Sequence, residues 1–445
     1  MRLVAHTLLV CVGFFFLVGS EPAVANTFWW NQTGNVSNDF NSSGNWNKTG
    51  GTTPVWGDQA FMTNAPSVSE TNIAYLNTGN GGFDVLVISN RAGAAQGINM
   101  VLVNGTFLQG DFVRIGTNGM ITVNNGSMTW WKGGTLGSGG TIVLNNSSLN
   151  YGGETEGNFQ FAGTIVGNSG TVAGTASGGN DAFRILSGGR VIANSGTLYF
   201  NPNDAFDHDG LTIDAGAVLQ VNSGATFVLN RTANAWNNDS PPDNAGTILL
   251  NGGTITMHFA GAQATDRGIQ NSGTISGSGT LAMRVAQSSS GQTIASNGVL
   301  NLFQTIAGNQ QTFTSDGGAF GTFKAVSGGT LKLNGNVASG MGGSWVVDNG
   351  GTLEVAGVNV DLGSAFMPGG NLNGTIKVTS GGNFTLSSAT AGGPTVQQNG
   401  TFEFNAGVSS TAQIFMPNVA GLAAFTNAGT FILTGAATGV GTFTS

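Results

Sequence analysis

The amino-acid sequence predicts an all-β protein built as a β-solenoid, and we expect a right-handed parallel β-helix with an aromatic-rich cap at its N-terminal end. Three observations support this prediction. Glycine accounts for 75 of the 445 residues, only 8% of the residues are charged, and a short motif returns along most of the chain. Usual values are roughly 7% glycine and about 25% charged residues, so this composition is far from that of an ordinary helical domain.

The recurring motif is a turn with Asn and Gly, followed by Gly-Thr and then by alternating apolar and polar residues. Clear copies start at Asn194 (NSGTLYFN), Asn244 (NAGTILLN) and Ser327 (SGGTLKLN). Alternation of this kind is the pattern of a half-buried strand. Asn and Gly supply the positive backbone angles of tight turns. The motif therefore predicts short strands that are separated by tight corners.

The spacing of the copies favours a solenoid. The threonines that lead successive copies between Thr171 and Thr274 are separated by irregular steps of 21 to 29 residues. Such steps suit coils that stack on one another and contact only their neighbours, whereas a propeller needs about 40–45 residues per blade. A β-sandwich is the alternative for parts of the chain. We interpret Thr274 and Thr280 as members of two strands of one coil, and we expect Asn or Thr to stack in hydrogen-bonded ladders.

The chain divides into a signal peptide over residues 1–25, an N-terminal cap or small β unit over residues 26–99, and solenoid repeats over residues 100–445. Arg2 followed by the apolar stretch from Leu8 to Val18 is typical of a secretory leader, and we expect cleavage after Ala25. Cys11 lies in this leader, so the exported chain has no cysteine chemistry. No later segment is long and apolar enough for a membrane-spanning helix.

The head of the chain carries four of the eight tryptophans, between Trp29 and Trp56, and lacks the repeat. Bulky aromatic side chains there can shield the first coil of a solenoid. Three motifs stand out: FWW at Phe28–Trp30, GNW at Gly44–Trp46 and WGDQAF at Trp56–Phe61. This head resembles that of large bacterial exported surface proteins with autotransporter-associated strand repeats and related β-helical passengers.

The resemblance implies a secreted or surface-displayed protein with a structural or adhesive role, and it offers no catalytic residues to transfer. Such passengers are usually followed by a membrane barrel or a sorting tail. The sequence up to Ser445 shows neither pattern, so the mode of anchoring stays open. We expect polysaccharides or cell-surface components as partners. Because charge is low and strand propensity is strong, we also expect self-association through solenoid ends.

The charge and the motifs argue against several other functions. A net charge of −8 and a pI near 4.7 give no basic footprint for nucleic acid. No phosphate-binding Gly-Lys-Ser/Thr and no His-Glu-x-x-His occur in the sequence. We therefore expect a protein without catalytic activity. The alternative is a β-helix protein that binds polysaccharides or degrades them as a lyase or hydrolase. A hydrolase would need a pair of facing carboxylates. Candidates are Asp181, Asp204, Asp207, Asp209, Asp239 and Asp243.

Two sets of residues are candidates for ligand binding. Trp130, Trp131 and Trp236 can stack on sugar rings if they lie on a flat β surface, and the alternative is that they fill the interior. Asp204, Asp207 and Asp209 place three carboxylates within six residues, which suits Ca²⁺ as the one candidate ion. The alternative for the aspartates is a solvated loop. The loops at residues 201–209 and 231–244 break the repeat, so we expect any groove to form there.

Overall fold

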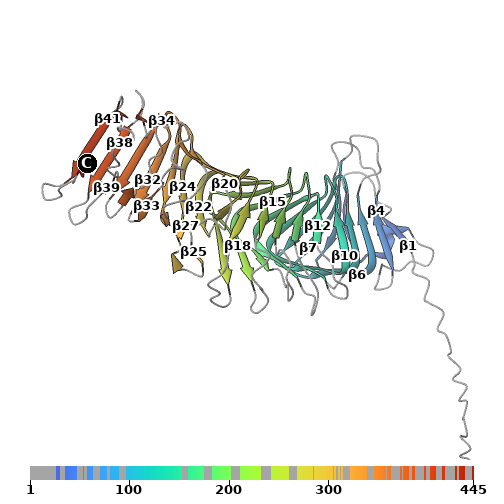
Figure 1. The fold of residues 1–445 in the computed structure, drawn as a ribbon. Coiled ribbons are helices and arrows are strands. Elements are labelled where there is room, and N and C mark those ends of the chain that lie inside the picture. Colours follow the sequence, from blue (N-terminus) through green and yellow to red (C-terminus); the bar gives the residue numbers. More distant parts are fainter. Residues whose placement is uncertain are drawn as a thin grey trace, which may run out of the picture.

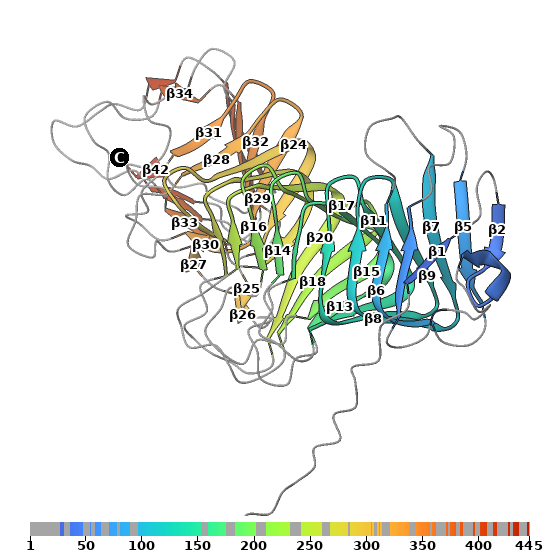
Figure 2. The ribbon, with the colours of Figure 1, turned by 90° about the vertical axis from the view of Figure 1, so that its right-hand side faces the viewer.

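The computed structural model is a β-solenoid whose coils stack from β1 (Thr27–Trp30) at one end to β41 (Thr430–Gly435) at the other (Figure 1). Each coil carries strands on three faces, which we call faces 1, 2 and 3 in chain order, and Figure 2 shows the same stack from the side. In the described part, no helix is long and apolar enough to cross a membrane. The residues described are 27–30, 36–47, 54, 58–63, 71–77, 81–89, 97–152, 159–174, 183–201, 211–231, 242–259, 268–283, 285–303, 305–306, 309–310, 312–313, 321–337, 344–356, 358–361, 371–372, 374–379, 383–385, 395–396, 401–406, 413–415, 426–427, 430–435 and 443–444.

Face 1 is a ladder of parallel strands in which each strand pairs with its counterpart one coil later. It consists of β1, β4 (Gln59–Met62), β6 (Gly81–Ile88), β8 (Phe107–Ile115), β10 (Ser127–Leu136), β12 (Phe159–Phe161), β14 (Phe183–Ile185), β16 (Leu211–Ile213), β19 (Asp243–Asn244), β21 (Ile269–Asn271) and β23 (Val285–Gln287).

Face 2 is a second parallel ladder. It consists of β2 (Val36–Asp39), β5 (Thr71–Leu76), β7 (Ile98–Asn104), β9 (Gly119–Asn124), β11 (Thr141–Tyr151), β13 (Thr164–Gly174), β15 (Arg190–Asn201), β17 (Val218–Asn222), β20 (Thr247–Phe259), β22 (Thr274–Ala282), β24 (Gln292–Leu302), β28 (Thr322–Ala325) and β31 (Ser344–Val347).

Face 3 is the longest ladder, because many strands continue around a corner and serve two faces. It joins parts of β6, β8, β10, β11, β13, β15, β20, β22 and β24 with β18 (Ala225–Arg231), β29 (Gly329–Leu333), β32 (Thr352–Ala356), β35 (Thr375–Thr379), β38 (Thr401–Ala406) and β41. The prediction of a β-solenoid is therefore confirmed.

The remaining elements are short. Toward the C-terminus, parallel ladders join β27 (Thr312–Phe313), β30 (Asn336–Val337), β33 (Asn359–Asp361), β36 (Asn383–Thr385), β39 (Gln413–Phe415) and β42 (Phe443–Thr444), and separately β34 (Asn371–Leu372), β37 (Thr395–Val396) and β40 (Thr426–Asn427). Antiparallel pairs are formed by β25 (Thr305–Ile306) with β26 (Asn309–Gln310) and by β1 with β3 (Trp46–Asn47), which follows the 3₁₀ turn η1 (Ser43–Asn45).

The register between paired strands shows whether the threonines that lead successive copies of the motif occupy equivalent positions in successive coils. Thr330, Thr352 and Thr375 lie directly opposite one another on face 3, as steps of one coil require. Thr274 and Thr280 lie on faces 2 and 3 of one coil, as predicted, but they belong to one continuous strand, β22, that turns the corner, and not to two strands. In contrast, the step from Thr226 to Thr247 crosses from face 3 to face 2. Similar motifs lead strands on both faces, so the motif alone does not identify the face.

The head of the chain belongs to the same stack. The boundary expected near residue 99 is crossed by parallel ladders, since β5 pairs with β7 and β6 pairs with β8. β3 runs antiparallel along β1, and a buried group of rings packs beneath it, with Trp46 in contact with Phe28, Trp30 and Phe40. The Trp46 indole donates to the Phe40 carbonyl oxygen over 2.7 Å. This is the kind of layer that a cap needs, and its shielding role stays a prediction.

The interior is filled by apolar side chains that repeat from coil to coil. Buried rings contact one another within and between coils, with centroid distances of 4.7 Å between Phe183 and Phe200 of one coil and 5.0 Å between Phe200 and Phe227 of successive coils. Where the large Trp130 ring turns inward, a glycine on the same strand, Gly134, leaves space for it. A Cβ on Gly134 would overlap the Trp130 ring, and it would lie 2.8 Å from the Val113 carbonyl oxygen.

Outside the interior, asparagine side chains form a ladder along the edge of face 2, as the sequence predicted. Eight asparagines in consecutive coils form this asparagine ladder, and the side-chain amide of each one after the first donates to the side-chain oxygen of the preceding coil over 2.5 to 3.2 Å. The eight are Asn77, Asn104, Asn124, Asn145, Asn168, Asn194, Asn222 and Asn251. The ladder adds one hydrogen bond per coil to the backbone pairing and holds the register.

A buried ladder of amides replaces apolar packing within the middle coils. Asn244 donates to Asn271 over 2.7 Å, and Asn271 donates to Gln287 over 3.2 Å. Thr293 also donates to Gln287, over 2.6 Å. In the coil before, the equivalent position holds Ile213, so the ladder starts at Asn244. Because buried amides are costly when they lack partners, this ladder disfavours any other register of these coils.

Ion pairs link coils in the C-terminal part, beyond the end of the asparagine ladder. Lys324 and Asp348 lie 2.7 Å apart, and Lys332 and Glu354 lie 2.9 Å apart. In the following coil Lys377 stands opposite Glu354. Opposite charges that face each other on adjacent strands stabilise a sheet, whereas like charges would repel. The few charged residues of this region are thus arranged to alternate in sign.

We expect Asn145→Ala to lower the free energy of unfolding by about 1–2 kcal/mol, because it leaves the Asn124 oxygen and the Asn168 amide without their ladder partners. Urea denaturation followed by tryptophan fluorescence measures the change. Asn150→Ala on the same strand is the matched control, since the one side-chain hydrogen bond of Asn150 among the described residues is a long one, to Thr129 at 3.5 Å. Equal losses in both variants would mean that the ladder does not stabilise the coil.

We expect Gly134→Ala to destabilise the protein by about 1–3 kcal/mol, because the added methyl group overlaps the buried Trp130 ring. Gly137→Ala is the control: its Cβ would lie 3.5 Å from the Ile115 carbonyl oxygen, an ordinary contact. Thermal unfolding of both variants checks this. A Gly137→Ala variant as unstable as Gly134→Ala would contradict the packing argument.

Candidate ligand-binding face

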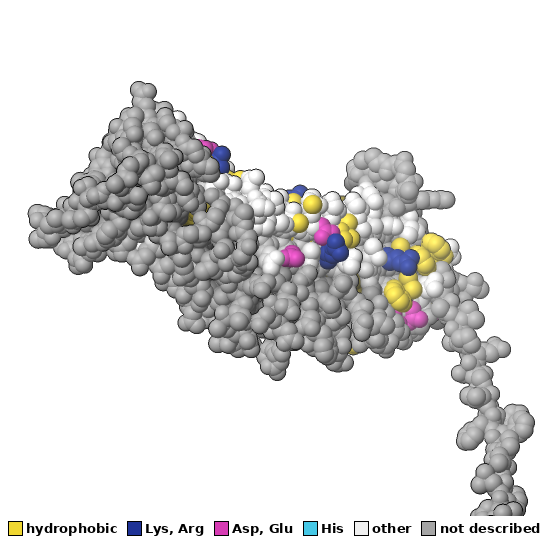
Figure 3. Space-filling view, in the orientation of Figure 1, with side chains coloured by type: hydrophobic (Ala, Val, Ile, Leu, Met, Phe, Trp, Pro, Cys, Tyr) yellow, Lys and Arg dark blue, Asp and Glu magenta, His cyan; other side chains and the backbone are white. Residues whose placement is uncertain are grey.

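The outer side of face 1 carries a group of exposed aromatic and apolar side chains near the β1 end. The side chains of Trp29, Phe112 and Trp131 are 46%, 43% and 39% exposed. Figure 3 shows hydrophobic side chains gathered near this end of the rod, with basic side chains beside them. We call the group the aromatic face. It consists of Trp29, Phe61, Val85, Val87, Phe112, Arg114 and Trp131.

Strand register explains why these side chains gather. Trp29, Phe61 and Val87 follow one another in consecutive coils, and Arg114 stands next to Val87 in the coil after that. Val85 and Phe112 form a second column two residues earlier on the same strands. Since side chains alternate in direction along a strand, all of these point outward while Leu86 and Val113 point into the core.

Trp29 and Phe61 form one end of the aromatic face. Their rings stack with centroids 4.6 Å apart and planes at 21°. The stacking runs from one coil to the next, so one face of the Trp29 ring is already covered. On its other side Trp29 stands opposite Asn47 of β3. This pair therefore offers mainly ring edges to a ligand.

Phe112 and Trp131 differ from this pair, because no described ring is stacked on either of them. Trp131 lies in the irregularity of β10 between Trp130 and Gly133, where the register against β8 shifts. Gly133 stands opposite Phe112 and brings no side chain to cover its ring. Phe112 and Trp131 are thus the two rings of the aromatic face that are open to a partner.

The structure separates the two adjacent tryptophans that the sequence proposed for sugar binding. Trp131 is exposed, as that proposal requires. The proposal is wrong for Trp130, whose side chain is 0% exposed and packs edge-on against Phe159 at 4.9 Å. Its indole Nε1 has no hydrogen-bond partner in the described part. Trp130 is therefore an interior residue.

The other predicted site residues lie mostly outside the described residues. This holds for Trp236, for the Ca²⁺ candidates Asp204, Asp207 and Asp209, and for the hydrolase candidates Asp181 and Asp239. Asp243 is described as a half-buried residue of β19. Among the described residues no three His, Cys, Asp or Glu side chains come together as metal ligands. The Ca²⁺ site and the self-association stay predictions.

A hollow with a volume of about 520 Å³ lies at the corner between faces 2 and 3 and is a second candidate site. Small polar residues of four coils line it, among them Asn125, Ser127, Asn146 and Ser148. Its amides and hydroxyls already bind one another: Asn146 donates to Asn125 over 3.1 Å, and Ser147 donates to the Val123 carbonyl over 2.9 Å. This hollow is the stacked turn column of the solenoid, and it is a weaker candidate than the aromatic face.

Comparison with known proteins gives one sequence relative and one solved structure. No family model matches the chain. The chain is 27% identical over 342 residues to the adhesin BmaC autotransporter of Brucella suis biovar 1 (strain 1330). The match covers 72% of this chain and 8% of that adhesin, so the chain spans less than a tenth of its relative. The solved structure of the hyper-glycosylated TibA fragment made with TibC matches with 15% identity and a TM-score of 0.27, over 83% of this chain and 100% of the fragment.

We expect Trp130→Ala to cost about 3–5 kcal/mol of unfolding free energy, because it empties a buried site. Trp131→Ala is the matched control and should change stability by less than about 1 kcal/mol, since that side chain is exposed. Urea denaturation followed by circular dichroism measures both. Similar losses for the two variants would contradict the assignment of one ring to the core and the other to the surface.

Proposed function

We propose that this chain is a stretch of a surface-displayed bacterial adhesin, in which a stiff β-solenoid presents the aromatic face to a partner. The observation that carries the proposal is the aromatic face itself, because contiguous exposed apolar side chains on a soluble protein mark interaction sites. The similarity to the Brucella adhesin supports it. Export fits the leader in residues 1–25, with cleavage expected after Ala25.

The solenoid supplies what an adhesive surface needs. Its interior and its corners are committed to packing and to turns, so binding has to use outward side chains. Backbone pairing and the asparagine ladder hold these side chains at a repeat of about 4.8 Å along the rod. Rigid aromatic side chains lose little conformational entropy on binding. A row of them on a rigid face is therefore suited to contact with a large partner.

We propose binding without turnover as the activity of this face. Its charged member is Arg114, and arginine cannot serve as a general acid or base at neutral pH. The alternative is a polysaccharide-degrading enzyme that uses carboxylates from the loops around residues 201–209 and 231–244. Release of reducing ends from polysaccharides incubated with the chain would favour that alternative.

The adhesive proposal predicts that beads carrying the full chain adhere to epithelial monolayers or to bare glass more than uncoated beads do. Replacing both open rings, Phe112→Ser with Trp131→Ser, should reduce adhesion about tenfold, because central aromatic residues carry most of the energy of an interface. Tyr199→Ser is the matched control, an equally exposed aromatic residue (39%) on face 3. Beads that adhere to neither surface, or a double variant that adheres like the control, would contradict the proposal.

A further inference from the structure

Arg114 is an exposed cation that forms no ion pair or hydrogen bond with any residue in the described part of the chain. The other cationic side chains that the structure describes have partners: Arg184 with Asp214, Arg190 with Gln220, Lys324 with Asp348, Lys332 with Glu354, and Lys377 with a contact of its own. The protein is acidic overall, with 21 acidic against 13 basic residues. An unpaired cation in such a protein marks a place where an anion can bind without displacing an internal partner.

The surroundings of Arg114 restrict the kind of anion. Val87 and Thr135 stand opposite it in the neighbouring coils, and Phe112 lies two residues before it on the same strand, about 6.6–6.8 Å away. Two acidic residues lie in this region, Asp111 three residues before Arg114 on β8 and Asp84 on β6 in the preceding coil. Asp111 is only 6% exposed, and Asp84 and Asp111 each have contacts of their own. The anion that fits is therefore one with an apolar body beside its charge.

The two open rings extend this site. Trp131 lies in the irregularity of β10 at the corner where face 1 begins, and Phe112 stands between that corner and Arg114. Across the face, the Trp131 ring is followed by the Phe112 ring and then by the Arg114 guanidinium. Gly133, opposite Phe112, has no side chain. Aromatic rings pack against the apolar faces of sugars, and arginine binds carboxylates through two parallel hydrogen bonds.

We infer that the aromatic face binds an acidic polysaccharide, with Phe112 and Trp131 packed against sugar rings and Arg114 bound to a carboxylate of the sugar. The inference rests on the proposed adhesive function and names the ligand class of the same face. An acidic peptide could use the same arginine. It is the less suitable ligand, because Phe112 and Arg114 lie on a strand that is paired on both sides and offers no free edge for a peptide backbone.

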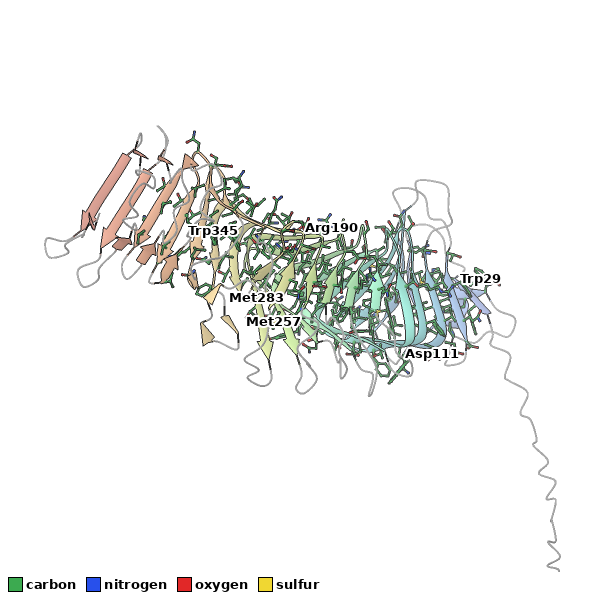
Figure 4. The ribbon with its side chains drawn as sticks, viewed as in Figure 1. Trp29, Asp111, Arg190, Met257, Met283 and Trp345 are labelled. Atoms are coloured by element: carbon green, nitrogen blue, oxygen red, sulfur yellow. The ribbon has the colours of Figure 1, made fainter. Side chains whose placement is uncertain are left out.

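The test measures binding of the full chain to polygalacturonate, alginate, hyaluronan and colominic acid, with fully methyl-esterified polygalacturonate as an uncharged probe of the same sugar ring. We expect at least one acidic glycan to bind. Arg114→Gln should weaken that binding about tenfold or more, and the ester, where it binds, should be insensitive to this change. Phe112→Ala and Trp131→Ala should weaken both. Arg190→Gln, farther along the rod (Figure 4), is the matched control. Circular dichroism confirms that each variant is folded.

Three outcomes would overturn the inference: binding to none of the four acidic glycans, binding that Arg114→Gln and Arg190→Gln change equally, or Arg114-dependent binding of poly-glutamate without binding of any glycan. The bead assay distinguishes a failure of the polysaccharide inference from a failure of the adhesin proposal. Beads that still adhere through Phe112 and Trp131, while no acidic glycan competes, would leave the adhesin proposal standing and reject the polysaccharide.

Discussion

In-register stacking of parallel strands is the constraint on which the rest of this structure depends. Each residue lies opposite its counterpart one coil away, so every column along the rod has to hold side chains that tolerate their own kind about 4.8 Å apart. Apolar residues tolerate such neighbours in the interior of the solenoid, and asparagines tolerate them by hydrogen bonding to each other. Charged residues are tolerated only when their sign alternates from coil to coil, as with Lys332, Glu354 and Lys377. The low charge content of the chain follows from the same constraint.

The same constraint decides what the sequence reveals. The coil spacing is readable at Thr330, Thr352 and Thr375, because alternation and a Gly-containing turn recur there with little insertion. The step from Thr226 to Thr247 was misleading, because corners on different faces use the same residue types. The head was predicted as a cap or a small β unit, because it lacks the Gly-Thr motif. Its strands nonetheless pair in register with the repeats, and backbone hydrogen bonds need no particular side chain.

Only part of the aromatic face can be predicted from the local amino-acid sequence. Adjacent side chains on a strand point to opposite sides, so only one of Trp130 and Trp131 can face the interior. The irregularity of β10 between Trp130 and Gly133 decides which one does, and the amino-acid composition does not reveal this irregularity. Phe112 and Arg114 were accessible to sequence reasoning, because Val113 and Ile115 between and beyond them are apolar core residues. What required the structure was the meeting of β1, β4, β6, β8 and β10 on one face, which depends on insertions of different length between strands.

The asparagine ladder also gives the rod a direction. All seven of its hydrogen bonds run the same way, from the amide of one coil to the oxygen of the coil before it. The side-chain dipoles of Asn77 through Asn251 therefore add along the axis instead of cancelling, much as peptide dipoles add in a helix. The end at Asn77, nearest the aromatic face, presents amide hydrogens, and the end at Asn251 presents a carbonyl oxygen. The two ends of the asparagine ladder are thus electrically unlike: the amide end at Asn77 favours an anion and the oxygen end at Asn251 favours a cation.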